Sequence, residues 1–168
     1  MSIEIGKLQK LTSPNPFALI TTRKRNGKTN IMALSWWTYV SNKPSMLAIC
    51  LSKKGYSGKL IKETGEFGLN LVGKEFMDVA MLCGRCSGCD VDKAEKFGIQ
   101  LLEANSMKTK ILKDAVATVE CKLVNSIEAS DHEIFIAEIT DIVINNPEGE
   151  QLYAINGYSM LQSIELPK

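Results

Sequence analysis

The pattern of hydrophobic and polar residues predicts strands in the first third of the chain. Residues 17–23 form a short run rich in apolar and β-branched side chains, and residues 29–40 resume with apolar and aromatic ones. Between them, Asn26-Gly27 is a strong signal for a two-residue hairpin turn. After a turn at residues 42–44, residues 45–52 form a continuous apolar run, typical of a strand buried on both faces. We therefore expect an all-β first third.

Short helices are predicted in the middle of the chain. The apolar spacing over residues 57–64, followed by Gly65, predicts a helix with a glycine at its C-terminal cap. Residues 74–81 predict a second short helix that ends before Gly84, and residues 92–98 predict one further helical turn.

The remaining apolar segments are predicted to be strands. Residues 67–72 form one, and residues 115–124 and 134–144 form two long paired strands joined by the polar stretch 125–133. A last strand is expected at residues 152–155. About seven strands with two or three short helices fit a closed or nearly closed antiparallel barrel, because hairpin-connected strands need no crossover helix. The predicted fold class is mainly β.

Composition narrows the class of protein. The 168 residues, 45% hydrophobic and 23% charged, predict a single soluble globular domain spanning residues 1–168. A net charge of +1 argues against nucleic acid as a partner. No apolar run approaches the ~20 residues of a membrane span, and residues 1–11 mix polar side chains into their apolar positions, so we expect no membrane association and a cytoplasmic location. The absence of GxGxxG and GxxxxGK[ST] motifs argues against Rossmann and P-loop nucleotide sites.

Cysteine usage points to a reducing compartment, because five cysteines are an odd number and the chain is long enough to fold without disulfides. Cys83, Cys86 and Cys89 form a CxxCxxC cluster that resembles the start of a bacterial ferredoxin cluster loop. The fourth cysteine of that pattern is absent, since Cys50 and Cys121 both lie in predicted strands. Three interpretations stay open for the cluster: unligated thiols, a reversible dithiol and disulfide pair, and a metal or iron–sulfur site.

Several short motifs follow one another between residues 10 and 145. A strand of small and apolar residues ends in two tryptophans, a proline and a buried strand follow, and a loop of Ser, Lys and Gly comes next. The segments that carry this pattern are residues 30–37, Pro44, and residues 46–51, 52–57, 65–70, 87–93 and 131–135. In this order and spacing they resemble the flavin reductase-like family, and within it the flavoredoxin-like branch, with its SGRDVDKF and GDHxxF segments. Cys89 stands where that family has the arginine of SGRD.

The resemblance implies an FMN-binding split barrel, an antiparallel and Greek-key-like fold that works as a homodimer with one FMN per subunit. Small side chains would let backbone groups approach the polar edge of the isoalloxazine ring, and hydroxyl and ammonium groups suit a phosphate monoester. Consecutive strand residues point to opposite faces, so only one of the two tryptophans can face a given site. The implied FMN-binding residues are Asn30, Met32, Ala33, Leu34, Ser35, Trp36 and Trp37 for the ring, and Ser52, Lys53, Lys54 and Ser57 for the phosphate.

His132 is the only histidine, which excludes sites that need two histidine ligands from one chain. A histidine in a polar hairpin is usually just solvated, but this one lies in the segment that resembles GDHxxF, near the flavin in the family. There its imidazole would hydrogen-bond a nicotinamide or help to move a proton. The flavin itself accepts hydride, so no other catalytic residue is expected.

The motif Cys83-Gly84-Arg85-Cys86 adds one expectation about reactivity. CxxC pairs can have lowered thiol pKa values, and Arg85 between the two cysteines would favour the thiolate.

The expected function is electron transfer by an FMN-binding flavoprotein, either a flavoredoxin-like carrier or an NAD(P)H-dependent flavin reductase. NADH, NADPH or a protein would donate electrons, and free flavin, a redox protein or a small molecule would accept them. One alternative is a non-enzymatic metal-binding or redox-sensing module that uses Cys83, Cys86 and Cys89. A weaker one is a barrel that dimerises without any ligand.

Overall fold

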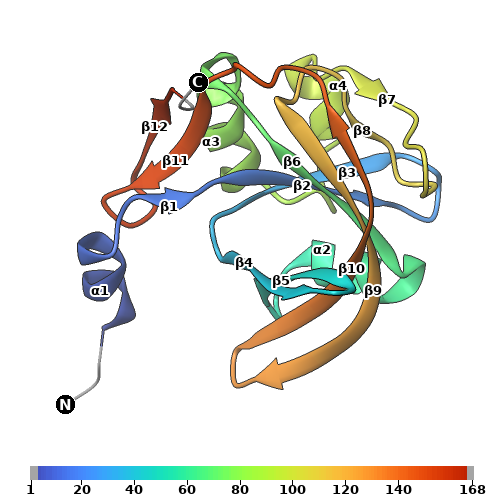
Figure 1. The fold of residues 1–168 in the computed structure, drawn as a ribbon, viewed down its shortest axis with the longest axis horizontal. Coiled ribbons are helices and arrows are strands. Elements are labelled where there is room, and N and C mark those ends of the chain that lie inside the picture. The colour runs from blue at the N-terminus through green and yellow to red at the C-terminus, as the bar shows by residue number, and fades with distance from the viewer. Residues whose placement is uncertain (1–3, 166–168) are drawn as a thin grey trace.

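The computed structural model describes residues 4–165, so both ends of the predicted domain, residues 1–3 and 166–168, lie outside it. A seven-stranded antiparallel sheet with the order β3-β2-β6-β9-β10-β5-β4 dominates the fold (Figure 1). Only Ser35 and Trp36 separate its two edge strands, β3 and β4, so the sheet curves until its edges approach. The strands are β2 (Ala18–Arg23), β3 (Thr29–Leu34), β4 (Trp37–Asn42), β5 (Ser45–Ser52), β6 (Glu66–Leu71), β9 (Ala117–Ala129) and β10 (His132–Ile144).

Smaller elements surround this curved sheet. A three-stranded sheet pairs β11 (Gln151–Ile155) with β1 (Asn15–Pro16) and β12 (Met160–Ile164), and β7 (Leu101–Leu102) pairs with β8 (Ile111–Leu112). In Figure 1, α1 stands apart from the sheet, whereas α3 packs against β3. The helices are α1 (Ile5–Leu11), α2 (Tyr56–Thr64), the 3-10 helix η1 (Lys74–Phe76), α3 (Met77–Arg85) and α4 (Lys93–Phe97). The predicted mainly β class is confirmed.

The first predicted hairpin is confirmed, but the strand predicted over residues 29–40 is two strands. β2 and β3 pair in register from Ala18↔Leu34 to Arg23↔Thr29, and Gly27 in the turn has a φ of 81°. β3 ends at Leu34, and β4 begins at Trp37 and pairs with β5 instead. Hydrophobic patterning continues through the break because Trp36 and Trp37 both pack against the buried core, so the pattern alone does not reveal the change of partner.

Two other expectations need correction. The polar stretch 125–133, predicted to join two strands, belongs almost entirely to them, because β9 and β10 extend to a tight turn at Ser130 and Asp131. The first third is not all-β, since α1 forms over residues 5–11. The sequence pattern did not predict α1 because none of its side chains is buried. Its apolar residues therefore do not follow the spacing typical of a helix that packs on the core.

The core consists of two clusters on opposite faces of the central strands. In β2, Leu19 belongs to the cluster under α3, and Ile20 belongs to the cluster inside the curved sheet with Phe67 and Phe135. Burial on both faces explains the continuous apolar sequence of these strands. Together the clusters hold β3 between α3 and the inside of the curved sheet. No helix within residues 4–165 is long and apolar enough to cross a membrane.

Candidate functional site

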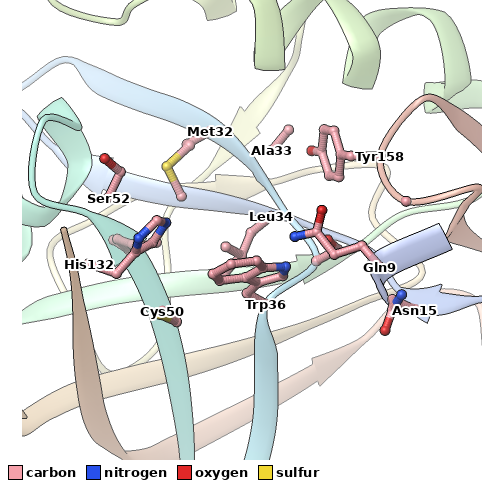
Figure 2. Close-up of a pocket in the computed structure, with 13 residues that line it drawn as sticks. Gln9, Asn15, Met32, Ala33, Leu34, Trp36, Cys50, Ser52, His132 and Tyr158 are labelled. Atoms are coloured by element: carbon pink, nitrogen blue, oxygen red, sulfur yellow. The ribbon is translucent and has the colours of Figure 1, made fainter. Parts of the chain in front are cut away.

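A hollow of about 250 Å³ lies beside the break between β3 and β4 (Figure 2). The end of β3, the end of β5 and the start of β10 form its walls, and α1 and the turn after β11 close one side. Figure 2 shows Trp36, Leu34 and His132 projecting into the same space. The lining residues are Gln9, Asn15, Met32, Ala33, Leu34, Ser35, Trp36, Cys50, Leu51, Ser52, His132, Gly157 and Tyr158.

A second hollow, of about 350 Å³, continues from the first. Met32, Ala33 and Tyr158 line both, so the two form one continuous groove. The second hollow lies between the N-terminus of α2 and the segment that ends α3. Its remaining lining residues are Asn30, Lys54, Gly55, Tyr56, Ser57, Cys83, Gly84, Arg85, Cys86, Ser87, Gly88 and Lys93.

Nine of the eleven residues implied as an FMN site line this groove: Asn30, Met32, Ala33, Leu34, Ser35, Trp36, Ser52, Lys54 and Ser57. The structure places the other two elsewhere. Lys53 lines a different hollow and forms a salt bridge of 2.8 Å with Glu128. Trp37 packs edge-on against Tyr39, with ring centroids 5.5 Å apart, and does not line the groove.

The first hollow has an aromatic wall. Trp36 and His132 stack with ring centroids 5.0 Å apart and an interplanar angle of 32°. His132 Nδ1 lies 2.9 Å from Asp131 Oδ1, so the carboxylate orients the imidazole, and hydrogen bonding to the imidazole lowers the pKa of Asp131. With Nδ1 engaged, Nε2 remains for a bound molecule. His132 also sits opposite Ser52 in the β5 and β10 pairing, which brings the two predicted segments together.

A buried hydrogen-bond network fixes the wall shared by β3 and α2. Asn30 Nδ2 donates to Thr22 Oγ1 and to Ser57 Oγ, both at 2.9 Å. Ser57 Oγ accepts this bond, so its own hydroxyl proton is available to a ligand. On the other side Gly88 approaches Asn30 so closely that a Cβ at Gly88 would overlap Asn30 Oδ1. The glycine therefore lets the segment after α3 pack directly on β3.

Lys93 holds the opposite wall. Its buried ammonium group donates to Ile31 O at 2.7 Å and to Cys83 O at 2.6 Å, joining β3 to α3. Burial lowers the pKa of Lys93. The sequence motif contained Lys93 without indicating this role. The one feature of the sequence that bears on the position of Lys93 is Asp92, a residue type that favours helix N-caps. Asp92 caps α4 by accepting a hydrogen bond from Glu95 N at 3.3 Å, which makes Lys93 the first residue of the helix.

The cysteine cluster is spread over the fold. Cys83, buried within α3, and Cys86, at the end of α3, both line the second hollow, whereas the exposed Cys89 lines a separate hollow. Within residues 4–165 no group of three or more His, Cys, Asp or Glu side chains is placed to hold a metal ion. Burial raises the pKa of the Cys83 thiol to about 11, the opposite of the expected lowering.

The sequence did not predict four residues that close one side of the first hollow and that come from near the two ends of the chain. Gln9 comes from α1, Asn15 from β1, and Gly157 and Tyr158 from the turn between β11 and β12. Burial raises the pKa of Tyr158 well above its usual range. About 150 residues separate Gln9 from Tyr158 in the chain, so no local pattern connects them.

The flavin reductase like domain matches residues 11–162, nearly the whole chain. The chain belongs to the flavin reductase-like family. The resemblance noted in residues 30–37, 52–57 and 131–135 is confirmed, and membership in this family supports a flavin-related redox role.

Relatives in this family come from archaea and bacteria. An uncharacterized protein of Archaeoglobus fulgidus is 31% identical over 115 residues, 68% of this chain and 65% of that protein. A flavin reductase of Pseudomonas putida is 26% identical over 151 residues, 90% of this chain and 85% of that protein. The matches to the A. fulgidus protein and to proteins of Aeropyrum pernix and Pyrococcus abyssi cover 65%, 46% and 64% of their lengths, so this chain spans about half to two thirds of each.

Solved structures of other proteins share the fold. Flavoredoxin of Desulfovibrio vulgaris (Miyazaki F) superposes with a TM-score of 0.84 at 23% identity, covering 94% of this chain and 91% of that one. The FMN-binding protein of Thermus thermophilus, solved with p-hydroxybenzaldehyde, has a TM-score of 0.83 at 19% identity, with 95% and 91% covered. These likenesses confirm the predicted split-barrel fold.

Proposed function

We propose that the chain binds FMN along the continuous groove and transfers electrons through it. The isoalloxazine ring would lie in the first hollow and the phosphate in the second. The single observation that carries this proposal is the continuity of the groove, which brings nine of the eleven implied residues to one site. The FMN-binding protein of T. thermophilus, which shares the fold, supports the choice of FMN.

The ring end of the groove fits a flat heteroaromatic molecule with a polar edge. β3 is an edge strand that pairs only with β2, so alternate backbone N–H and C=O groups over Met32 to Leu34 have no strand partner. Such groups can hydrogen-bond the pyrimidine edge of the ring. Met32, Ala33 and Trp36 supply apolar surface for its face.

The phosphate end fits an anion. α2 begins at Tyr56 after Gly55, and no side chain caps its first turn, so the N–H groups there are free for a ligand. Lys54 and Arg85 line the same hollow, and neither forms a salt bridge with a carboxylate in residues 4–165. With the hydroxyl of Ser57, they provide both charge and hydrogen bonds for a phosphate monoester.

Bound FMN would supply the two-electron redox chemistry, as it does throughout flavin enzymology. The chain's own residues bind and orient it. His132, held by Asp131 and stacked on Trp36, stands where its Nε2 can hydrogen-bond a second molecule that enters the first hollow. A nicotinamide donor, NADH or NADPH, is the donor that we propose for this position, with a redox protein as the alternative.

We also propose that the chain forms a homodimer through α1. This helix has seven residues and no buried side chain, and a helix that short is marginal without packing. It exposes Ile5, Leu8 and Leu11 by 57%, 54% and 82%, while its Gln9 lines the groove. A second copy of the chain that covered these apolar residues would stabilise α1 and close the groove beside it.

The absorption spectrum of the protein purified under anaerobic conditions, with chromatography of the flavin released by heat, tests the proposal. We expect two resolved flavin bands and about one bound flavin per chain. Lys54→Ala should weaken FMN binding about tenfold, whereas Lys53→Ala, the matched control at the adjacent position outside the groove, should leave it unchanged. A colourless protein that fails to bind added FMN would exclude the proposed function, and a broad brown absorption would instead support a metal centre at the cysteines.

A further inference from the structure

A third hollow, of about 510 Å³, lies next to the phosphate end of the groove. Its walls come from the turn of the β2 and β3 hairpin, from α2, and from the segment that follows α3. Tyr56 lines both this hollow and the groove, so the two spaces meet at the first residue of α2. Its volume falls within the range of about 300 to 1,000 Å³ usual for small-molecule sites, so a sizeable ligand fragment fits.

The charges around this hollow favour an anion. Arg25 and Glu63 neutralise each other in a two-bond pair, with Nε to Oε2 at 3.0 Å and Nη2 to Oε1 at 2.9 Å. Lys24 and Lys59 also line the hollow, and neither forms a salt bridge with a carboxylate among the described residues. Asp92 forms a salt bridge of 2.8 Å with Lys28, and the hydrogen bond to Lys28, with a smaller contribution from Lys24, lowers the pKa of Asp92. Two ammonium groups therefore remain for a ligand.

We propose that the third hollow binds the adenylate half of FAD, so that FAD binds to the groove more tightly than FMN. This rests on the proposed flavin site, because it begins from a phosphate at the N-terminus of α2. FMN ends at that phosphate, whereas FAD continues into a second phosphate, a ribose and an adenine. The second phosphate would meet Lys24 and Lys59, and the adenine would pack on the half-buried ring of Tyr56.

Titration of the flavin-free full-length protein with FMN and with FAD, followed by flavin fluorescence, tests the proposal. We expect the Kd for FAD to lie about tenfold below that for FMN. The double variant Lys24→Ala/Lys59→Ala should raise the Kd for FAD about tenfold and leave that for FMN unchanged. Lys122→Ala, which removes one charge from an exposed position on β9 that lines neither space, is the control and should alter neither Kd. Added AMP, which matches the part of FAD beyond the FMN phosphate, should compete with FAD and should not compete with FMN.

Equal affinities for the two flavins, or equal losses in the double variant, would overturn the proposal. The proposal would also be overturned if the double variant weakened NADPH binding to the FMN-loaded protein and left FAD binding unchanged. The third hollow would then bind the phosphorylated adenosine of NADPH. Failure of both flavins to bind would exclude the flavin site itself. Tight FMN binding without a gain for FAD would exclude only the adenylate site.

Discussion

Cys83 lies near the end of α3, and only 1% of its surface is exposed. The CxxC motif and the neighbouring Arg85 led to the expectation of a lowered thiol pKa. The motif lies at the C-terminal end of a helix, where the helix dipole does not favour a thiolate, and burial disfavours the charged form. Burial therefore raises the pKa to about 11, although nearby Lys93 opposes the shift. At the scale of single residues, the surroundings of a side chain decide its chemistry more than its motif does.

The raised pKa of Cys83 predicts a loss of stability at alkaline pH. The folded protein keeps the thiol proton between the unfolded pKa of 9.0 and the folded pKa of about 11, whereas the unfolded chain releases it. The stabilising contribution is therefore complete below pH 9 and is lost as the pH rises through 11, amounting to roughly 3 kcal/mol.

Urea unfolding of the protein at pH 8 and at pH 11 measures this loss. Cys83→Ala should lose less stability than the parent over that range, because the buried thiol is gone. Cys89→Ala, which removes an exposed thiol, is the control and should behave as the parent does. The same pH dependence in Cys83→Ala and in the parent would contradict the prediction.

His132 predicts a second effect at the residue scale. We expect His132→Gln to slow the reduction of bound FMN by NADH about 10 to 100-fold, because the variant loses the imidazole that we propose contacts the donor. Asp131→Asn should produce a smaller loss, since Asp131 only orients the ring through the 2.9 Å contact. Stopped-flow absorbance at the flavin band measures both. Unchanged rates with unchanged FMN affinity would exclude the donor position at His132.

At the scale of elements, the groove depends on how closely the segment after α3 approaches β3. The ammonium of Lys93 joins α3 to β3 through two backbone carbonyls, and Gly88 lies directly on Asn30. In contrast, the C-terminus of α2 follows a purely local rule, because Gly65 adopts a φ of 73° and its N–H bonds Ile61 O. Local caps were therefore predictable, and the contact between distant segments was not.

Gly88→Ala tests this approach between elements. The added methyl group would overlap Asn30 Oδ1, so the segment must move away from β3 and open the phosphate end of the groove. We expect the Kd for FMN to rise about tenfold and the free energy of unfolding to fall by about 1 to 3 kcal/mol. Gly6→Ala in α1, where an added Cβ meets nothing within 4 Å, is the control: FMN affinity should stay unchanged, and the free energy of unfolding should not fall, because Ala favours a helix more than Gly does. FMN titration and urea unfolding measure both, and unchanged FMN binding in Gly88→Ala would show that the segment does not shape the site.

At the scale of the whole molecule, the curvature of the sheet places the break between β3 and β4 at one wall of the groove. Helix α1 lies beside this groove. Figure 1 shows α1 away from the main sheet, and its apolar residues have no cover from within the chain. The proposed homodimer follows from this exposure together with the position of Gln9 in the groove.

The homodimer predicts that charged substitutions on α1 separate the subunits. Leu8→Glu/Leu11→Glu should yield a monomer in light scattering after size-exclusion chromatography, because buried carboxylates would oppose the interface. Lys10→Glu, an exposed position on the same helix, should leave the dimer intact. A monomeric parent protein, or a double variant that remains a dimer, would contradict the interface. The same samples report FMN affinity, which we expect to fall in the monomer.

The sequence by itself determined most of the strands and the helix over α2, because these depend on local patterning and turn chemistry. The segments that line the groove, residues 30–37, 52–57, 87–93 and 131–135, were identified by their resemblance to a family. Only the tertiary structure decided the rest. β3 and β4 separate because each pairs with a different strand, and Lys53 turns away toward Glu128. Tyr158 lines the same hollow as Met32, which lies about 125 residues earlier in the chain. These features depend on contacts between segments far apart in the chain, to which no local pattern responds.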